Sequence, residues 1–165
     1  APLVFALLSA CDGVPVVPQD GGHADAPAAM GVLGLGEGEL SYRPIEDGDT
    51  LLIAQGCQGS QHVWITLRSQ DMDPRGLIID LELRRASDDT LVSASFHLRL
   101  SFDPDASGEF AQLSGITLQV PDPDMALDQD LILWGQLQDR DGVIAESSRR
   151  VRIAWGTERC MELTG

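Results

Sequence analysis

The sequence contains no lysine, and this absence limits the partners that the protein can bind by charge. All 11 basic residues are arginine, and 26 acidic residues bring the formal net charge to −15 over 165 residues. Proteins that bind nucleic acid or an anionic membrane surface by charge do so with an excess of Lys and Arg. The composition therefore argues against nucleic acid as a partner, and it favours a soluble, acidic surface that attracts cations.

Recognisable catalytic motifs are also missing. The sequence has no G-x-S-x-G, no H-E-x-x-H and no P-loop. The glycine-rich GLGEGE at 34–39 follows no predicted strand, and Glu37 and Glu39 would repel a phosphate group. Paired carboxylates occur mainly in turns, where Asp is an ordinary turn former. We therefore expect a protein that is not an enzyme. We also expect no cofactor, with bound Ca²⁺ as the alternative.

No apolar run approaches the roughly 20 residues that a membrane-spanning helix needs. The run at 2–8, PLVFALL, ends in small residues and is typical of the apolar part of a secretory signal, whose charged first part we expect to be missing. Residues 8–11, LSAC, resemble the lipobox of bacterial lipoproteins. The resemblance implies that residues 1–10 are removed and that Cys11 carries lipid, which anchors the protein on the periplasmic or surface side of a bacterial membrane.

Proline, glycine, aspartate and alanine dominate residues 12–30, a composition that cannot bury enough apolar surface to fold. We expect residues 11–35 to be the lipidated Cys and a flexible tether, and residues 36–165 to form one domain. Of the three cysteines, Cys57 and Cys160 then remain, and outside the cytoplasm such a pair is expected to form a disulfide.

From residue 39 onward, short stretches alternate apolar and polar residues, with clusters of Gly, Pro and Asp between them. Alternation predicts half-buried strands. It places Val92, Leu98 and Phe102 on one buried face, and His62 and Thr66 on a wet face. The predicted strands are 39–45, 50–54, 61–68, 77–84, 90–102, 116–120, 131–138 and 143–155.

About eight short strands separated by turns are typical of an all-β fold, a two-sheet antiparallel sandwich with residues 131–155 as its terminal hairpin. The pattern over residues 36–155 resembles the immunoglobulin and fibronectin type III superfold, in particular the Ig-like domains of bacterial lipoproteins with a G-x-Q-G-x-Q-H-V-W type segment. The hallmark spacing is missing, because Trp64 follows Cys57 by only seven residues. The resemblance implies a fold and no activity, since the superfold has many functions.

The segment AQGCQGSQHVW at 54–64 concentrates amides, a Cys, a His and a Trp where a loop enters a strand. Amide groups and an aromatic face suit a hydroxylated or peptide ligand. We expect Gln58, Gln61, His62 and Trp64 to form a ligand site. The alternative is a structured loop in which glycines supply turn dihedrals and Gln side chains cap backbone groups.

The segment DPDASGE at 103–109 resembles the opening half of an EF-hand calcium loop, with Asp103, Asp105, Ser107 and Glu109 at alternating positions. The twelfth position of this loop is Ser114 instead of Glu, so a solvated hairpin turn is the alternative. His62 and His97 would form a two-His metal site if their strands were neighbours.

Together these features predict a lipid-anchored cell-envelope protein whose single domain binds an envelope or extracellular protein or a glycan. The first alternative is an envelope protein that binds calcium or a transition metal. The second is a hydrolase that uses carboxylates in the turns.

Overall fold

The computed structural model describes residues 30–56 and 59–159. This part of the chain is all-β, as the sequence predicts, with ten strands, one short 3₁₀ helix and no α-helix. None of its elements is a helix with the length and hydropathy that crossing a membrane requires. The elements are β1 (Val32–Glu37), β2 (Arg43–Pro44), β3 (Thr50–Gln55), β4 (Gln61–Gln70), β5 (Leu77–Arg85), β6 (Phe96–Leu100), β7 (Asp103–Pro104), β8 (Ala111–Gln119), η1 (Pro123–Met125), β9 (Leu131–Gln138) and β10 (Ile144–Arg159).

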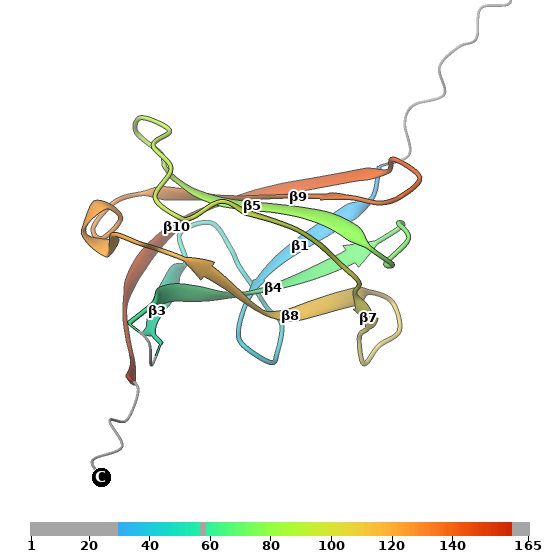
Figure 1. Ribbon diagram of the computed structural model, residues 1–165, viewed down its shortest axis with the longest axis horizontal. Coiled ribbons are helices and arrows are strands. Elements are labelled where there is room, and N and C mark those ends of the chain that lie inside the picture. Colours follow the sequence, from blue (N-terminus) through green and yellow to red (C-terminus); the bar gives the residue numbers. More distant parts are fainter. Residues whose placement is uncertain (1–29, 57–58, 160–165) are drawn as a thin grey trace, which may run out of the picture.

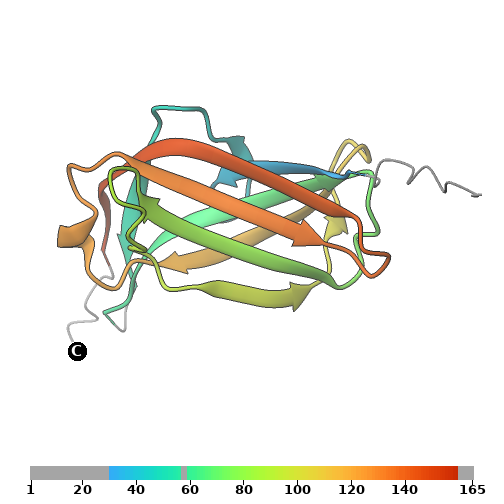
Figure 2. The same cartoon turned by 90° about the horizontal axis from the view of Figure 1, so that it is seen from above.

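The strands form one continuous sheet that curls on itself (Figure 1). Its order is β2-β1-β4-β3-β10-β9-β5-β6, and β8 branches from β4 and pairs with β7. The long strand β10 belongs to both parts of the sheet, because residues 144–151 pair with β9 and the remainder pairs with β3. As a result, β5, β6 and β9 lie over β1, β4 and β8, which the view from above also shows (Figure 2).

The predicted arrangement of two separate antiparallel sheets is found only in part. The terminal hairpin is confirmed, since β9 and β10 pair in antiparallel register from Ile144 and Gln138 to Val151 and Leu131. However, β10 joins the two parts, and it runs parallel to β3. A parallel pair needs a long connection, which the many residues between β3 and β10 provide.

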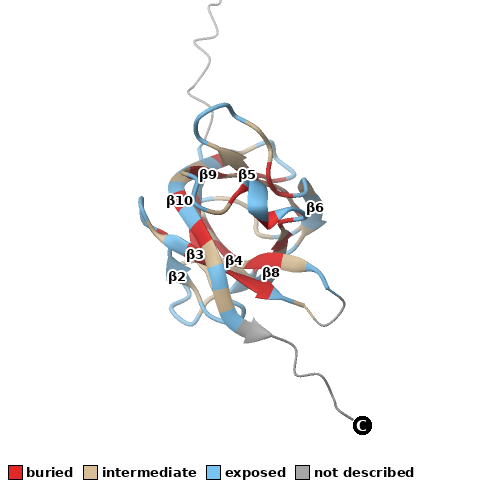
Figure 3. Cartoon of the chain, turned by 90° about the vertical axis from the view of Figure 1, so that its left-hand side faces the viewer, coloured by how far each residue is buried: buried red, intermediate tan, exposed pale blue. Residues whose placement is uncertain are grey.

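Aliphatic side chains from alternate strand positions fill the space between the two parts of the sheet. Figure 3 shows buried segments in both parts. In β5, Ile79, Leu81 and Leu83 are fully buried, whereas Asp80 and Glu82 between them are partly exposed, as predicted. Burial of one aliphatic side chain of this size stabilises the fold by about 1.5–3 kcal/mol. Burial of the side chains in this shared core is therefore the main contribution that holds the curled sheet closed.

Gly135 is a core position without a side chain. It lies in β9 directly opposite Leu81 of β5, and it is buried. A Cβ atom at Gly135 would lie 2.9 Å from Cδ2 of Leu81 and 3.1 Å from Cδ2 of Leu35 in β1. Leucines from both parts of the sheet thus fill the volume that a larger residue at 135 would need.

The predicted strand at 90–102 is interrupted: Leu91 forms an isolated bridge with Arg84 of β5, and regular pairing with β5 begins only in β6. Before β6, Ser93 is buried, and its Oγ accepts the backbone N–H of Leu83 at 2.9 Å. The N–H of Ala94 then donates to the carbonyl of Gln119 in β8. Because the chain crosses between the two parts of the sheet here, the alternation is broken, and Leu98 on the edge strand is 49% exposed instead of buried.

The sheet begins earlier than predicted, because β1 lies partly within the segment 11–35 that was expected to be a tether. Its glycines make room for an aromatic ring. A Cβ at Gly34 would lie 2.7 Å from the Tyr42 hydroxyl, and a Cβ at Gly36 would lie 2.5 Å from the same ring. Glycine is typical of a linker, but at these two positions of β1 it is required because the Tyr42 ring packs against the strand.

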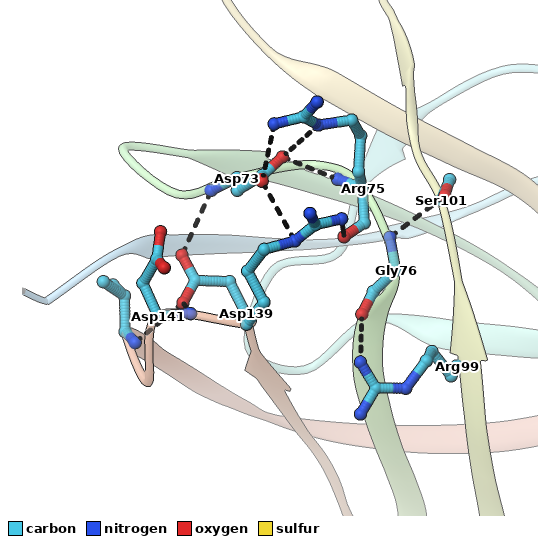
Figure 4. Close-up of polar contacts among 9 residues, drawn as sticks. Asp73, Arg75, Gly76, Arg99, Ser101, Asp139 and Asp141 are labelled. Atoms are coloured by element: carbon cyan, nitrogen blue, oxygen red, sulfur yellow. Dashed lines mark hydrogen bonds and ion pairs between the residues drawn. The ribbon is translucent and has the colours of Figure 1, made fainter.

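Buried Asp139 joins the β9–β10 turn to the β4–β5 turn at one end of the sheet (Figure 4). Its carboxylate accepts the backbone N–H groups of Asp141 and Val143 at 2.9 Å and that of Asp73 at 3.1 Å. Burial by itself raises the pKa of Asp139. The three N–H groups together lower this pKa by more than burial raises it, so the net shift is downward. The hydrogen bonds with Arg75 hold the pKa of Asp73 at about 2. This cluster fixes the turns in place.

Candidate functional site

A groove of about 430 Å³ lies where β1 and β3 separate along β4. Since β8 takes one edge of β4, β1 and β3 share the other edge. The last β1 pair on this edge is Glu37 with Ile65, and the first β3 pair is Ile53 with Val63. Trp64 lies between these two pairs and lines the groove. The groove is therefore built at a fork between hydrogen-bonded strands.

The turn between β1 and β2, residues 38–42, provides one wall of the groove and covers part of β4. Two hydrogen bonds of Gly38 hold this turn against β4. The N–H of Gly38 donates to the carbonyl of Trp64 at 3.2 Å, and the carbonyl of Gly38 accepts the hydroxyl of Thr66 at 2.8 Å. Gly38 has a φ of 134°, a conformation that favours glycine. Because of this turn, Thr66 is fully buried, and the prediction of a wet face for this part of β4 is wrong.

Negative charge in the groove is only partly compensated. Glu37 pairs with Arg43 through Oε2, and its Oε1 accepts the backbone N–H of Leu52 at 3.1 Å. Arg43 also lies 3.7 Å from a carboxylate oxygen of Asp49. Glu39 is exposed, and within the described part of the chain no side-chain hydrogen bond or ion pair engages its carboxylate. Glu39 therefore supplies the surplus charge.

His62 packs against Trp64, with the two rings edge to face and their centroids 4.7 Å apart. It is 6% exposed, and neither ring nitrogen has a hydrogen-bond partner. Burial lowers the pKa of His62 from its ordinary value of 6.5, and the Glu39 carboxylate opposes this with a smaller effect. Burial thus favours the neutral imidazole beside the Trp64 ring, and the prediction that His62 is solvent-exposed is wrong.

We expect the free energy of unfolding to fall as the pH drops below 6.5, in part because of His62. With a lowered pKa in the folded state, His62 binds a proton more readily in the unfolded chain, so stability is full above pH 6.5 and is lost as the pH falls. Urea unfolding at pH 7.5 and 5.5 measures this loss. His62→Phe should reduce it, whereas His97→Phe, at an exposed site on β6, serves as the control. An unchanged pH dependence in His62→Phe would contradict the assignment.

Of the four residues predicted to bind ligand, two lie together in the structure. His62 and Trp64 share one face of β4, and Trp64 lines the groove. Gln61 adjoins His62 in the strand, so its side chain points to the opposite face, and its carbonyl accepts the N–H of Val120 at 2.7 Å. Gln58 lies outside the described residues.

The predicted calcium loop at 103–109 consists of β7 and the hydrogen-bonded turn that follows it. Oδ1 of Asp105 accepts the backbone N–H and the hydroxyl of Ser107 and the N–H of Gly108, and Oδ2 lies 3.3 Å from Arg68. The hydrogen bond from Ser107 makes the largest contribution to a lowered pKa of Asp105. Protein donors therefore already occupy the carboxylate that a calcium ion would need, as the alternative of a hairpin turn predicts.

The other predicted metal ligands do not converge. Asp103 and Glu109 are exposed. His62 belongs to β4, whereas His97 belongs to β6, where it lies 2.5 Å from Asp80 of β5. In residues 30–56 and 59–159, no three His, Cys, Asp or Glu side chains are grouped so that they could hold a metal ion.

Sequence analysis missed most of the residues that line the groove. Glu37 and Glu39 were considered only as part of a phosphate loop, although they lie at the end of a strand and in the turn after it. Leu52 gave a usable signal, because it is an apolar residue between the buried Leu51 and Ile53, at a position that alternation places on the wet face.

The lining as a whole combines an indole ring, aliphatic groups, hydroxyl groups and one surplus carboxylate. Such a mixture suits noncovalent binding of a group that is partly apolar and partly polar. Comparison with protein-family models and with curated proteins gives no match for this chain.

Proposed function

We propose that the protein is a lipid-anchored cell-envelope protein whose domain binds a partner in the groove beside Trp64. The curled arrangement of strands, with one part of the sheet over the other around a single core, supports an immunoglobulin-like sandwich as the description of the domain. Folds of this kind carry many functions, so the groove and not the fold supports the binding role.

One observation carries the proposal: a partly exposed Trp lines a hollow whose surrounding strands and turn are fixed by hydrogen bonds. Trp64 is held by strand pairing, by the turn at Gly38 and by contact with His62. Ligand sites are typically concave and preformed, and an aromatic side chain provides contact area at a low cost in conformational entropy. Leu52 is half exposed in the same groove, and covering its apolar surface with a ligand would be favourable.

The proposed location depends on residues outside the described part of the chain. These are Cys11, the predicted lipidation site, and Cys57 and Cys160, the predicted disulfide. The pairing of Gln55 with Arg159 supports the disulfide, because these residues come two and one positions before the cysteines. We expect protein from the cell envelope to have no free thiol. Intact-mass analysis after thiol alkylation measures this, and two alkylated cysteines would refute the disulfide.

The proposal places binding ahead of a hydrolase that uses carboxylates in the turns. A general acid or base among the carboxylates would need a raised pKa near the working pH. The pKa values of Asp73, Asp88, Asp105, Asp130 and Asp139 are instead all lowered, and each of these groups accepts hydrogen bonds. These features suit fixed turns.

Binding is tested on the full chain with Cys11→Ser, which leaves it unlipidated. Three probes are titrated and followed by NMR: maltotetraose, the peptide Ac-Gly-Leu-Arg-Leu-Gly-NH2 and the same peptide with citrulline in place of Arg. We expect at least one probe to shift the signals of Glu39, Leu52 and Trp64. Trp64→Ala should abolish the shifts, and Trp134→Ala, which removes a partly exposed Trp outside the groove, should retain them. If no probe shifts these signals, the binding proposal is overturned.

The anchor is tested separately in cells that express the protein with its complete leader. Metabolic labelling with a palmitate analogue should label the wild-type chain and leave Cys11→Ser unlabelled. A wild-type chain that stays unlabelled would overturn the anchor, and the groove would be unaffected.

A further inference from the structure

We infer that the groove beside Trp64 receives the positively charged side chain of an arginine or lysine from a partner protein. The inference rests on the proposed binding function and adds the chemical class of the ligand. It is carried by the groove itself, by the charges along its wall and by the aromatic ring on its floor.

The charges of the groove favour a cation. Its lining includes two carboxylates, Glu37 and Glu39, and one guanidinium, that of Arg43. Arg43 is paired with Glu37 and lies close to Asp49, so its charge is already compensated. Glu39 is left with an exposed carboxylate at the rim. A positively charged group in the groove would complete the pairing, whereas an anion would meet uncompensated negative charge.

The ring of Trp64 provides the second contact for a cation. Among aromatic side chains, Trp gives the strongest cation–π attraction, which is worth about 0.5–2 kcal/mol depending on exposure. The edge-to-face contact with His62 fixes the orientation of the indole. Glu39 lines the same groove as Trp64, and its carboxylate acts on the neighbouring His62, whose lowered pKa it opposes. A negative group and an aromatic ring thus act on the same small volume.

The charge of the whole chain acts in the same direction. A net charge of −15 attracts cationic partners from a distance and raises their association rate. It disfavours phosphorylated ligands and acidic glycans. The effect is electrostatic, so it weakens as salt shortens the range of interaction.

Apolar surface in the groove and in the turn beside it favours a protein over a small cation. Leu52 is 51% exposed inside the groove, and Leu40, in the turn that forms its wall, is 85% exposed. A free ammonium ion would leave both uncovered. A peptide segment carries apolar residues next to its charged side chain, and these residues can cover Leu52 and Leu40. Protein interfaces combine an apolar core with charged contacts in the same way.

The test compares the arginine peptide with its citrulline counterpart, which has nearly the same shape and no charge. We expect the arginine peptide to bind about tenfold more tightly, because citrulline loses both the ion pair and the cation–π contact. Glu39→Gln should remove most of this difference. Asp124→Asn, an exposed acid outside the groove, removes the same charge and should retain it. Raising the salt concentration should weaken binding of the arginine peptide and leave the citrulline peptide nearly unchanged.

Glu39 is exposed in a turn, so its substitution is expected to leave the fold intact, and the dispersion of the NMR spectrum checks this. Equal binding of the two peptides, or binding of maltotetraose alone, would overturn the charge inference while the groove remained a binding site. If no probe binds, both the inference and the proposed function are overturned. A difference between the peptides that persists in Glu39→Gln would place the cation elsewhere and overturn the inference.

Discussion

Asp139→Ala is expected to lower the free energy of unfolding by about 2–4 kcal/mol, a large share of the stability of a domain this size. The carboxylate is 6% exposed and accepts three backbone N–H groups from two turns. Alanine would leave these donors without partners in a space that admits little water, and each loss costs about 1 kcal/mol or more. Urea unfolding followed by tryptophan fluorescence measures the change.

Asp141→Ala provides the matched control for this prediction. Asp141 lies in the same turn and its carboxylate is exposed, so its removal should change stability by less than about 0.5 kcal/mol. Asp139→Asn should be intermediate, because the amide oxygen still accepts while the NH₂ group faces further donors. Equal effects of Asp139→Ala and Asp141→Ala would show that the hydrogen bonds contribute little.

The second large effect is expected for Leu81→Ala, with a loss of about 2–5 kcal/mol. Leu81 is fully buried and leans over Gly135 in the neighbouring strand. Gly135→Ala alone should also destabilise, by about 1–3 kcal/mol, because its new methyl group would meet Leu81 and Leu35. Thermal or urea unfolding of each variant gives these values.

The effect of Gly135→Ala on the free energy of unfolding should change sign when Leu81→Ala is also present. In the Leu81→Ala background the cavity has room for the methyl group, so Gly135→Ala should recover part of the lost stability instead of reducing it further. The interaction energy of this double-mutant cycle is therefore expected to be favourable. Simple additivity would contradict the packing that we describe around Gly135.

Alternation along the chain was enough to predict the all-β class and the central strands. The predicted strands at 77–84 and 131–138 coincide with β5 and β9, and in both strands every second residue is buried. The terminal hairpin followed from its turn residues. Prediction failed where local pattern and tertiary contact disagree. The stretch at 90–102 alternates well, but its first half crosses the core and its second half is an edge strand.

The site was predicted less well, for a related reason. Trp64 and His62 were identified from their residue types, and both lie beside the groove or in its lining. The residues that complete the groove come from strands far apart in sequence, and only the fork at β4 brings Glu39 and Leu52 together. No periodicity in one sequence encodes such a fork.

The placement of β1 determines how the groove would face a surface to which the chain is attached. Met30, the first described residue, lies beside Ile144 at the near end of β1, and the groove opens at the far end. At about 3.3 Å per residue, the six residues of β1 separate these two points by roughly 20 Å. A protein held by its N-terminal side would therefore carry the groove at the end of β1 that lies away from the attachment, and the attachment itself would not block access to the groove.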